Sequence, residues 1–322
     1  MSNSTNFSAC TSDMIRKAAV ALKAGHLVAF PTETVYGLGA DARNPDAVKR
    51  IYEVKGRPTD HPLIVHISSI NQIEKWAMEI PDYAISLARA FWPGPMTLIL
   101  KRTVISKDFI TGGQDSVGLR VPSDLIALSL IQEFEKISDS AIAAPSANRF
   151  GRLSPTSASD VEEEIGSLLK SGDLILNGGF SEVGIESTII DVRDQSPRIM
   201  RPGAVTEQMI NDFLPKIDHS KPMGEKIRVS GSLEQHYMPD AKVIVNQTPK
   251  PGQAFVALVG VETPIGVHRI AAPQSVEEFA KCLYGAMREA DRRQFAELVI
   301  EIPEEPGLAS AILDRVKKSA NR

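Results

Sequence analysis

The sequence PTETVYGLG at residues 31–39 directly follows HLVAF, an apolar segment at residues 26–30. We expect the apolar segment to form a buried strand that ends at Pro31, because proline has no N–H group for a strand ladder. Open α/β sheets bind ligands outside the carboxyl ends of their strands, and Gly37 and Gly39 would let backbone amides approach a ligand. Threonine and glycine are also common in turns, so this segment alone predicts a ligand site or an ordinary turn.

Length and composition indicate a globular protein with room for two domains. The chain has 322 residues, of which 43% are hydrophobic and 24% are charged. The formal net charge of -4 argues against a protein that coats nucleic acid, although it leaves room for a local basic patch.

Cysteine content and hydropathy indicate the compartment. Cys10 and Cys282 lie far apart in the sequence, which argues against a disulfide framework and a cysteine zinc site. The sequence contains no apolar run of the roughly 18 residues that a membrane helix needs. Residues 1–13 are polar and lack the features of a secretory signal. We therefore expect a cytoplasmic protein without a membrane segment.

Helical and strand patterns alternate up to about residue 208, which predicts an α/β fold. A helix capped by Thr11 or Ser12 should end at Gly25, and another should run from Asn44 and Pro45 to Gly56. Further helices are expected at 70–78 and 81–91, and strands at 63–67, 96–100, 117–121, 141–144, 174–176, 188–192 and 199–200.

The composition changes at residues 215–240, where lysine, proline, glycine and serine dominate without an apolar period. We interpret this stretch as a linker or a functional loop. Beyond it, strands at 241–246, 254–259 and 298–302 and helices at 275–291 and 308–318 predict a second, small α/β domain.

Several short polar motifs follow predicted strands or helices. KGRP at residues 55–58, with His61 and His66, suits a phosphate or a carboxylate, but lysine and arginine also complement the dipole of a helix end. APSAN at 144–148, EST at 186–188 and RPG at 201–203 are weak signals singly, and their convergence on one face is a hypothesis. The sequence contains no P-loop, GxGxxG, GxSxG or HExxH motif, so covalent catalysis and a standard dinucleotide site are not supported.

Eight segments in this order and spacing resemble the YrdC-like family of L-threonylcarbamoyladenylate synthases. They are PTETVYGLG, KGRP, HPLIVHI, WPGPMTL, VGLRVP, APSAN, ESTIID and RPGAV, over roughly residues 18–205. The HYMP segment at 236–239 and the following unit resemble the long form of that family. The resemblance implies a YrdC-like twisted open sheet with helices at residues 1–208, a linker at 209–241 that covers the active site, and a small Rossmann-like α/β domain at 242–322.

The resemblance also implies a reaction. L-threonine, bicarbonate and ATP, with Mg²⁺ accompanying the nucleotide, would give threonylcarbamoyl-AMP and pyrophosphate, and downstream proteins would transfer the threonylcarbamoyl group to adenosine 37 of tRNA. Direct contact with tRNA stays open. No dedicated metal ligands are identified, so the ion would be coordinated by the triphosphate and by water.

Site residues follow from the same resemblance. L-threonine would be bound by Thr34, His66, Arg120, Ala144 and Ser187. ATP would be bound by Arg57, His61, Ser116, Ser146, Ser154, Arg201 and Tyr237, with Lys55 and Arg57 offsetting phosphate charge during catalysis and Asn148 shaping the pocket. The family often has asparagine at the position of His61 and usually alanine at that of Met238.

Two other functions are compatible with parts of the sequence. The basic helix end and the ordered loops also suit a module that binds structured RNA without forming an adenylate. A carbamoyltransferase of metallocentre maturation uses a related domain, but it normally carries cysteine-rich zinc modules that two cysteines cannot supply. We expect the synthase.

Overall fold

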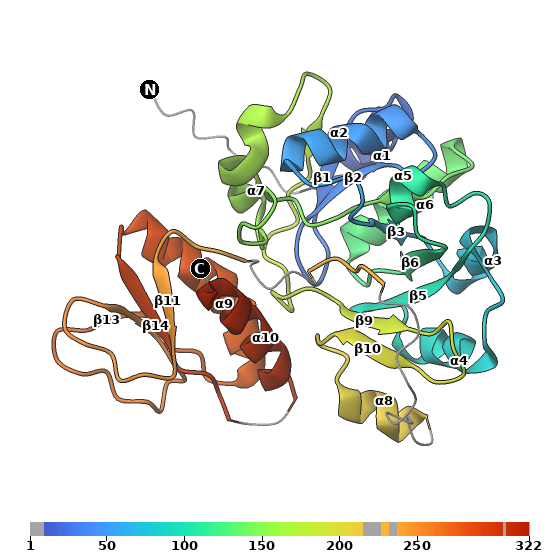
Figure 1. The fold of residues 1–322 in the computed structure, drawn as a ribbon. Helices are drawn as coiled ribbons and strands as arrows, with labels where there is room; N and C mark the ends of the chain where they lie inside the picture. The colour runs from blue at the N-terminus through green and yellow to red at the C-terminus, as the bar shows by residue number, and fades with distance from the viewer. Residues whose placement is uncertain (1–9, 215–226, 232–236, 305–306, 322) are drawn as a thin grey trace.

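The computed structural model describes residues 10–214, 227–231, 237–304 and 307–321. Within these ranges the chain forms a large α/β unit with a mixed sheet and a smaller unit with a second sheet (Figure 1). The expected α/β class is therefore confirmed. None of the helices in these ranges is long and apolar enough to cross a membrane.

The large sheet is twisted and open, with strand order β10-β9-β5-β6-β3-β7-β2-β1-β8, and β4 pairs with β5 at its side. Only β1 with β8, β3 with β6, and β5 with β9 are parallel neighbours in it. The strands are β1 (Val28–Phe30), β2 (Gly37–Asp41), β3 (Ile64–His66), β4 (Ala77–Met78), β5 (Met96–Arg102), β6 (Ser116–Arg120), β7 (Ile142–Ala143), β8 (Leu174–Ile175), β9 (Thr188–Asp191) and β10 (Arg198–Arg201).

Helices cover both faces of this sheet, because successive strand residues point to opposite sides. Val28 and Phe30 pack toward α1 and α6, whereas Leu27 and Ala29 belong to the main core with α2. The helices of the large unit are α1 (Ser12–Lys23), α2 (Pro45–Lys55), α3 (Ile73–Trp76), α4 (Asp82–Phe91), α5 (Asp108–Thr111), α6 (Leu125–Ile137), α7 (Ala158–Ile165) and α8 (Glu207–Phe213).

Helix ends follow the expected capping chemistry. The Thr11 side chain accepts a hydrogen bond from the N–H of Met14 at the start of α1, and Asn44 caps α2, which begins with a proline. Helix α2 ends at Gly56, whose backbone is left-handed with φ of 61°. This turn directs the chain out of the helix immediately before Arg57.

The PTETVYGLG segment differs from the expected loop. Its last residues begin β2, which pairs antiparallel with β1 and so turns back along it. Gly39 has a packing role, because a Cβ atom there would lie 2.8 Å from Ile142 Cγ2 and 2.9 Å from the Phe30 ring. These glycines interrupt the alternation of apolar and polar residues that would have indicated a strand.

Other expected elements are shorter or divided. The helix expected at 70–78 is a 3₁₀ turn (Ile70–Gln72), the four-residue α3 and the strand β4, because Ala77 and Met78 pair with the edge of β5 instead. In the small unit, strand β13 (His268–Ala271) was not predicted, since its sequence shows no clear alternation.

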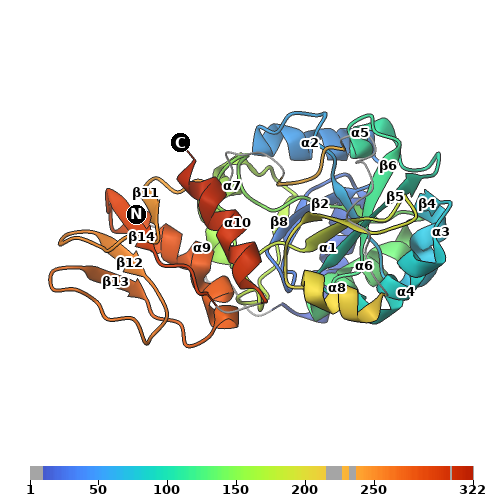
Figure 2. The same ribbon diagram turned by 60° about the horizontal axis from the view of Figure 1, so that its bottom comes forward.

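The smaller unit contains a parallel sheet of order β11-β14-β12-β13. Its elements are β11 (Lys242–Val245), β12 (Ala254–Val256), β13, α9 (Val276–Arg292), β14 (Glu297–Ile300) and α10 (Ala309–Ala320). Figures 1 and 2 agree that α9 and α10 lie between this sheet and the large unit. Two helices of the small unit therefore form its contact with the rest of the molecule.

Candidate active site

A cavity lined largely by polar and charged side chains lies in the large unit. The polar motifs that are separate in the sequence converge here, and the residues that line the cavity are Thr32, Thr34, Val35, Tyr36, Gly37, Arg57, Ile64, His66, Arg120, Ala144, Pro145, Ser146, Glu186, Ser187, Arg201, Ser230, Gly231 and Tyr237.

Arg120, at the end of β6, is buried and forms an ion pair with Glu33 of the PTETVYGLG segment. Its Nη2 donates to Glu33 Oε1 over 2.7 Å. Among the described residues, Arg120 Nε and Glu33 Oε2 are buried without a hydrogen-bond partner. The cavity therefore contains a guanidinium with donor capacity for a second oxyanion.

His66 ends β3 beside Arg120 and is almost fully buried. Burial, followed by the charge of Arg120, lowers the pKa of His66 to about 3. The imidazole is therefore neutral over the physiological range. Its Nδ1 is buried and has no hydrogen-bond partner within the described part of the chain.

Arg57 and Arg201 also line the cavity and supply positive charge to it. Arg57 Nη2 donates to the carbonyl of Pro62 and to the Ser230 hydroxyl, and Arg201 Nε donates to the carbonyl of Ser187. Burial lowers the pKa of Arg57 to about 10, which leaves it charged at neutral pH. Because these acceptors are uncharged, both guanidinium groups remain suited to an anionic ligand.

Hydroxyl groups of Ser187, Thr34 and Ser146 also belong to residues that line the cavity. The Ser187 hydroxyl lies 2.8 Å from the Thr97 hydroxyl and accepts a hydrogen bond from Arg201 Nη2 over 3.1 Å. Thr34 is held by the Thr32 hydroxyl at 2.8 Å. Ser146 reaches the cavity because its backbone forms an isolated bridge with Gly37 at the start of β2.

Lys55 does not line the cavity, although it was assigned to phosphate. It is buried at the end of α2, where its Nζ donates to the carbonyls of Ser146 and Asn148. Burial, followed by the charge of Arg57, lowers the pKa of Lys55 well below its usual value. In this structure Lys55 holds the APSAN loop in place, and the Asn148 amide extends that support to the carbonyls of Arg149 and Arg152.

Three other expected nucleotide residues lie outside the cavity lining. His61 is half-buried against the Phe150 ring at 5.3 Å, and Ser116 lines a neighbouring hollow together with Ser230. The Ser154 hydroxyl is fully buried and donates to the Glu186 carboxylate over 2.5 Å. The other expected residues, Thr34, His66, Arg120, Ala144, Ser187, Arg57, Ser146, Arg201 and Tyr237, all line the cavity.

The expected linker contributes three of its described residues to the cavity. Ser230, Gly231 and Tyr237 line it, and Tyr237 is 1% exposed. Tyr237 also adopts a left-handed backbone with φ of 62°. Residues 215–226 and 232–236 of the expected cover, with His236, lie outside the described residues.

Glu186, Thr32 and Tyr36 also line the cavity but were not assigned to it from the sequence. Thr32 and Tyr36 belong to the quoted motif and Glu186 precedes Ser187, so their nearness to assigned residues was the available signal. Within the described ranges, no group of three histidine, cysteine or acidic side chains is arranged to hold a metal ion. Cys10 and Cys282 are free thiols.

Family models cover nearly the whole chain. Residues 20–203 match the model described as Telomere recombination, of the Sua5, YciO and YrdC proteins. Residues 205–321 match the model described as Threonylcarbamoyl-AMP synthase, C-terminal domain. Together the two matches confirm the resemblance to the long form of the family.

Individual relatives agree with the models. The chain is 40% identical to the threonylcarbamoyl-AMP synthase of Pyrococcus abyssi, covering 95% of this chain and 94% of the relative. It is 37% identical to that of Bacillus subtilis, covering 95% and 92%. The crystal structure of P. abyssi Sua5 complexed with L-threonine matches with a TM-score of 0.85 at 38% identity, covering 96% of this chain and 95% of the other. The chain belongs to the threonylcarbamoyl-AMP synthase family, in the form with a C-terminal domain.

Proposed function

We propose that this protein converts L-threonine, bicarbonate and ATP into threonylcarbamoyl-AMP and pyrophosphate, for modification of adenosine 37 of tRNA. The observation that carries the proposal is the cavity, whose lining combines a partly unsatisfied guanidinium at Arg120 with two further arginines, Arg57 and Arg201. The name of the relatives at 37–40% identity and the threonine in the P. abyssi structure support the same activity.

L-threonine would bind on the Arg120 side. The guanidinium fork matches the two oxygens of a carboxylate, and Arg120 has a spare donor there. Thr34, His66 and Ser187 offer neutral polar groups around it, and Ala144 supplies backbone and a small side chain that leaves space. Because His66 is neutral, its unprotonated ring nitrogen can accept a hydrogen bond from a hydroxyl or an amine donor.

ATP would bind toward Arg57, Ser146, Arg201 and Tyr237. Arg57 and Arg201 are charged donors suited to phosphate oxygens, and Tyr237 encloses the cavity from the linker side. His61, Ser116 and Ser154 lie around this region and would contact the nucleotide only after a local rearrangement. Lys55 would act on the site by holding the loop that carries Ser146.

A metal ion would enter with the nucleotide. Mg²⁺ prefers oxygen ligands, retains several waters and commonly binds substrate phosphates, so it would neutralise triphosphate charge without a protein cage.

The reaction needs no nucleophile from the protein. The neutral amine of L-threonine and bicarbonate would give a carbamate and water, and a carbamate oxygen would then attack the α-phosphorus of ATP. The bond from that phosphorus to the bridging oxygen breaks, and pyrophosphate leaves. The protein would position the two reactants in line and stabilise charge on the phosphates with Arg57 and Arg201.

The product would pass to proteins that transfer the threonylcarbamoyl group to tRNA, and we place this step in the cytoplasm, where tRNA is modified. Direct contact between this chain and tRNA would speed that transfer but is not required by the reaction.

The test is incubation of the pure protein with ATP, magnesium, bicarbonate and L-threonine, followed by mass spectrometry of pyrophosphate and threonylcarbamoyl-AMP. We expect both products to depend on L-threonine and bicarbonate, with serine replacing threonine as the specificity control. Folded protein that binds ATP and forms neither product would contradict the proposal and favour an RNA-binding role.

A further inference from the structure

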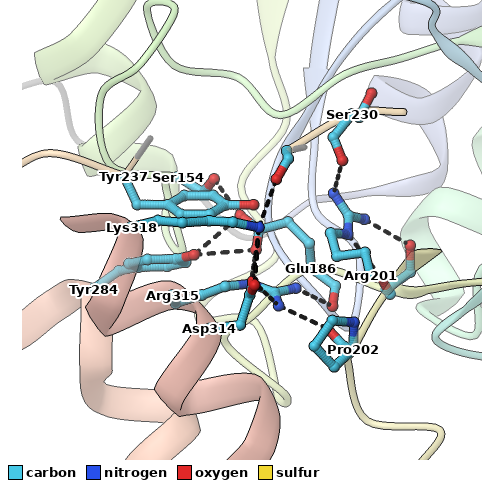
Figure 3. Close-up of polar contacts among 12 residues, drawn as sticks. Ser154, Glu186, Arg201, Pro202, Ser230, Tyr237, Tyr284, Asp314, Arg315 and Lys318 are labelled. Carbon is cyan, nitrogen blue, oxygen red and sulfur yellow. Dashed lines mark hydrogen bonds and ion pairs between the residues drawn. The ribbon is translucent and has the colours of Figure 1, made fainter. Parts of the chain in front are cut away.

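A buried polar cluster joins the small unit to the wall of the cavity (Figure 3). Two residues form its centre. Glu186 lines the cavity, and Arg315 comes from α10 and is fully buried. The residues are 129 positions apart in the chain. The role inferred for this cluster rests on the proposed function, which assigns the two substrates to the cavity.

Each side-chain nitrogen atom of Arg315 donates a hydrogen bond to the large unit. Its Nε donates to Glu186 Oε2 over 3.0 Å, Nη2 to the carbonyl of Glu186 over 3.3 Å, and Nη1 to the carbonyl of Pro202 over 2.6 Å. One guanidinium therefore connects two backbone segments of the large unit as well as a carboxylate. A lysine in this position has one nitrogen and could not reproduce this fork.

The Glu186 carboxylate is also held by neutral donors from two other elements. The Tyr284 hydroxyl, on α9, lies 3.0 Å from Oε2, and Ser154 donates to Oε1. These contacts satisfy the buried carboxylate and fix its orientation, because a buried charge needs both a counter-charge and hydrogen bonds.

The two segments held by Arg315 each carry an expected substrate-binding residue. Glu186 precedes Ser187, which we assign to L-threonine, and Pro202 follows Arg201, which we assign to ATP. Arg201 in turn donates to the carbonyl and the hydroxyl of Ser187. Fixing Glu186 and Pro202 therefore fixes the relative placement of the groups that face the two substrates.

Helix α10 also holds the linker part of the cavity. The Ser319 hydroxyl donates to the carbonyl of Tyr237 over 2.7 Å, and Lys318 donates to the carbonyl of Gly231 over 2.8 Å. The Arg315 guanidinium carbon lies 5.7 Å from the centre of the Tyr237 ring, within reach of a cation–π contact. Tyr237 and Gly231 line the cavity, so α10 supports this side too.

We propose that Arg315 is a positioning residue of the active site, through which the C-terminal unit holds Ser187 and Arg201 in register and thereby couples the L-threonine and ATP subsites. It acts from behind the cavity wall, through Glu186 and Pro202, and does not touch the substrates. The C-terminal unit is then a structural part of the active site rather than an independent domain.

Electrostatics support this arrangement. Burial alone would raise the pKa of Glu186, but Arg315 and then Arg201 outweigh it and lower that pKa to about 2. Loss of the Arg315 charge would leave burial less opposed, so the Glu186 carboxyl would take up a proton at a higher pH. The groups that face Glu186 from the surrounding elements are Arg315 on α10, Tyr284 on α9, Arg201 on β10, Ser154 and Tyr237.

The test compares Arg315→Gln and Arg315→Lys with Arg292→Ala in the full chain. Arg292 is an interface control, because it joins α9 to Asp160 and Glu163 on α7 without contacting the Glu186 cluster. Affinities for L-threonine and for ATP are measured by calorimetry, and pyrophosphate release gives KM and kcat. Thermal unfolding shows that each variant is folded.

We expect Arg315→Gln to weaken both L-threonine and ATP by about tenfold or more, since hydrogen bonds to a charged group are lost. Arg315→Lys should recover part of the activity, and Arg292→Ala should match wild type. Arg315→Gln should also lose activity on the acid side at a pH where wild type is unaffected, and Arg315→Gln combined with Glu186→Gln should lack that acid-side loss.

Arg315→Gln with wild-type affinities and pH profile would overturn the proposal. So would an equal loss in Arg292→Ala, because the effect would then reflect general docking of the two units. If wild type binds L-threonine yet forms no product, the proposed function fails alone, and the affinity comparison still decides whether Arg315 positions the site.

Discussion

Two buried arginine–glutamate pairs border the same cavity but differ in how completely they are bonded. Arg120 and Glu33 share one hydrogen bond, and each retains a buried atom without a partner among the described residues. Arg315 and Glu186 belong to a cluster in which every nitrogen of the guanidinium and both carboxylate oxygens are bonded. The first pair lies within the large unit, and the second joins the two units.

The difference separates a binding role from a positioning role. A buried polar group without a partner is costly, and a ligand that satisfies it recovers that free energy on binding. Arg120 can therefore exchange or extend its contacts toward a carboxylate. A saturated cluster gains nothing from a ligand, and breaking it leaves an uncompensated buried charge. Residues of the second kind hold a site in shape.

The largest expected effect is on stability, from breaking the saturated pair. Glu186→Ala should lower the free energy of unfolding by roughly 3–5 kcal/mol, because Arg315 stays buried and charged without its carboxylate. Chemical denaturation followed by circular dichroism measures the change. Glu186→Gln is the matched control and should cost less, since its amide oxygen still accepts a hydrogen bond.

Replacing both partners tests whether the destabilisation comes from the unpaired buried charge or from loss of the ion pair itself. The double variant Glu186→Leu with Arg315→Met should be more stable than Glu186→Ala, because apolar groups of similar volume leave no unpaired charge. A double variant less stable than the single one would mean that the pair itself, and not the orphaned charge, provides the stability.

The next effect is on binding, at the unsaturated pair. Arg120→Ala should weaken L-threonine binding by about 2 kcal/mol or more, because a charge-assisted contact to the carboxylate is lost. Calorimetry with L-threonine and, separately, with ATP measures both affinities. An equal loss for the two ligands would refute the assignment of Arg120 to L-threonine.

The sequence predicted the α/β class, and its ordered motifs contain most of the residues that line the cavity. Where the structure differs from the expectation, the cause is local. Gly37 and Gly39 were expected in a loop, yet they begin β2, where Gly37 still lines the cavity and Gly39 is needed because Ile142 and Phe30 pack close to the backbone. Lys55 was expected beside phosphate, and in the structure its ammonium donates to the carbonyls of the APSAN loop, a contact that the sequence does not indicate.

Long-range pairs were beyond the reach of local patterns. Glu33 and Arg120 are 87 residues apart, and nothing in either motif indicates that they meet. Arg315 lies in an amphipathic helix where a basic residue would ordinarily face solvent. Its burial depends on how the small unit docks against the large one, which is a property of the tertiary structure.

A smaller effect is expected from the acidic partner of Arg120. Glu33→Gln should tighten L-threonine binding by about 1 kcal/mol, because the free protein then holds a buried guanidinium with a weaker partner that the ligand carboxylate can replace. The affinity of ATP serves as the internal control and should change little. Weaker L-threonine binding in this variant would show that Glu33 contacts the ligand itself.

The smallest expected effect near neutral pH is on the stability that the saturated pair of Glu186 and Arg315 contributes, which depends on pH. The pKa of Glu186 is lowered to about 2 in the folded protein, against about 4.3 for an unperturbed glutamate. The pair's contribution to stability is therefore fully present above about pH 5 and is lost as the pH falls toward 2, where the folded carboxylate also takes up a proton. Denaturation of wild type and of the Glu186→Leu, Arg315→Met double variant should give parallel pH curves from about pH 5 to 8, and only below that range should wild type lose more stability. Divergence at neutral pH would instead mean that Glu186 already binds a proton there, and that the carboxylate at the cavity wall is not held ionised by Arg315.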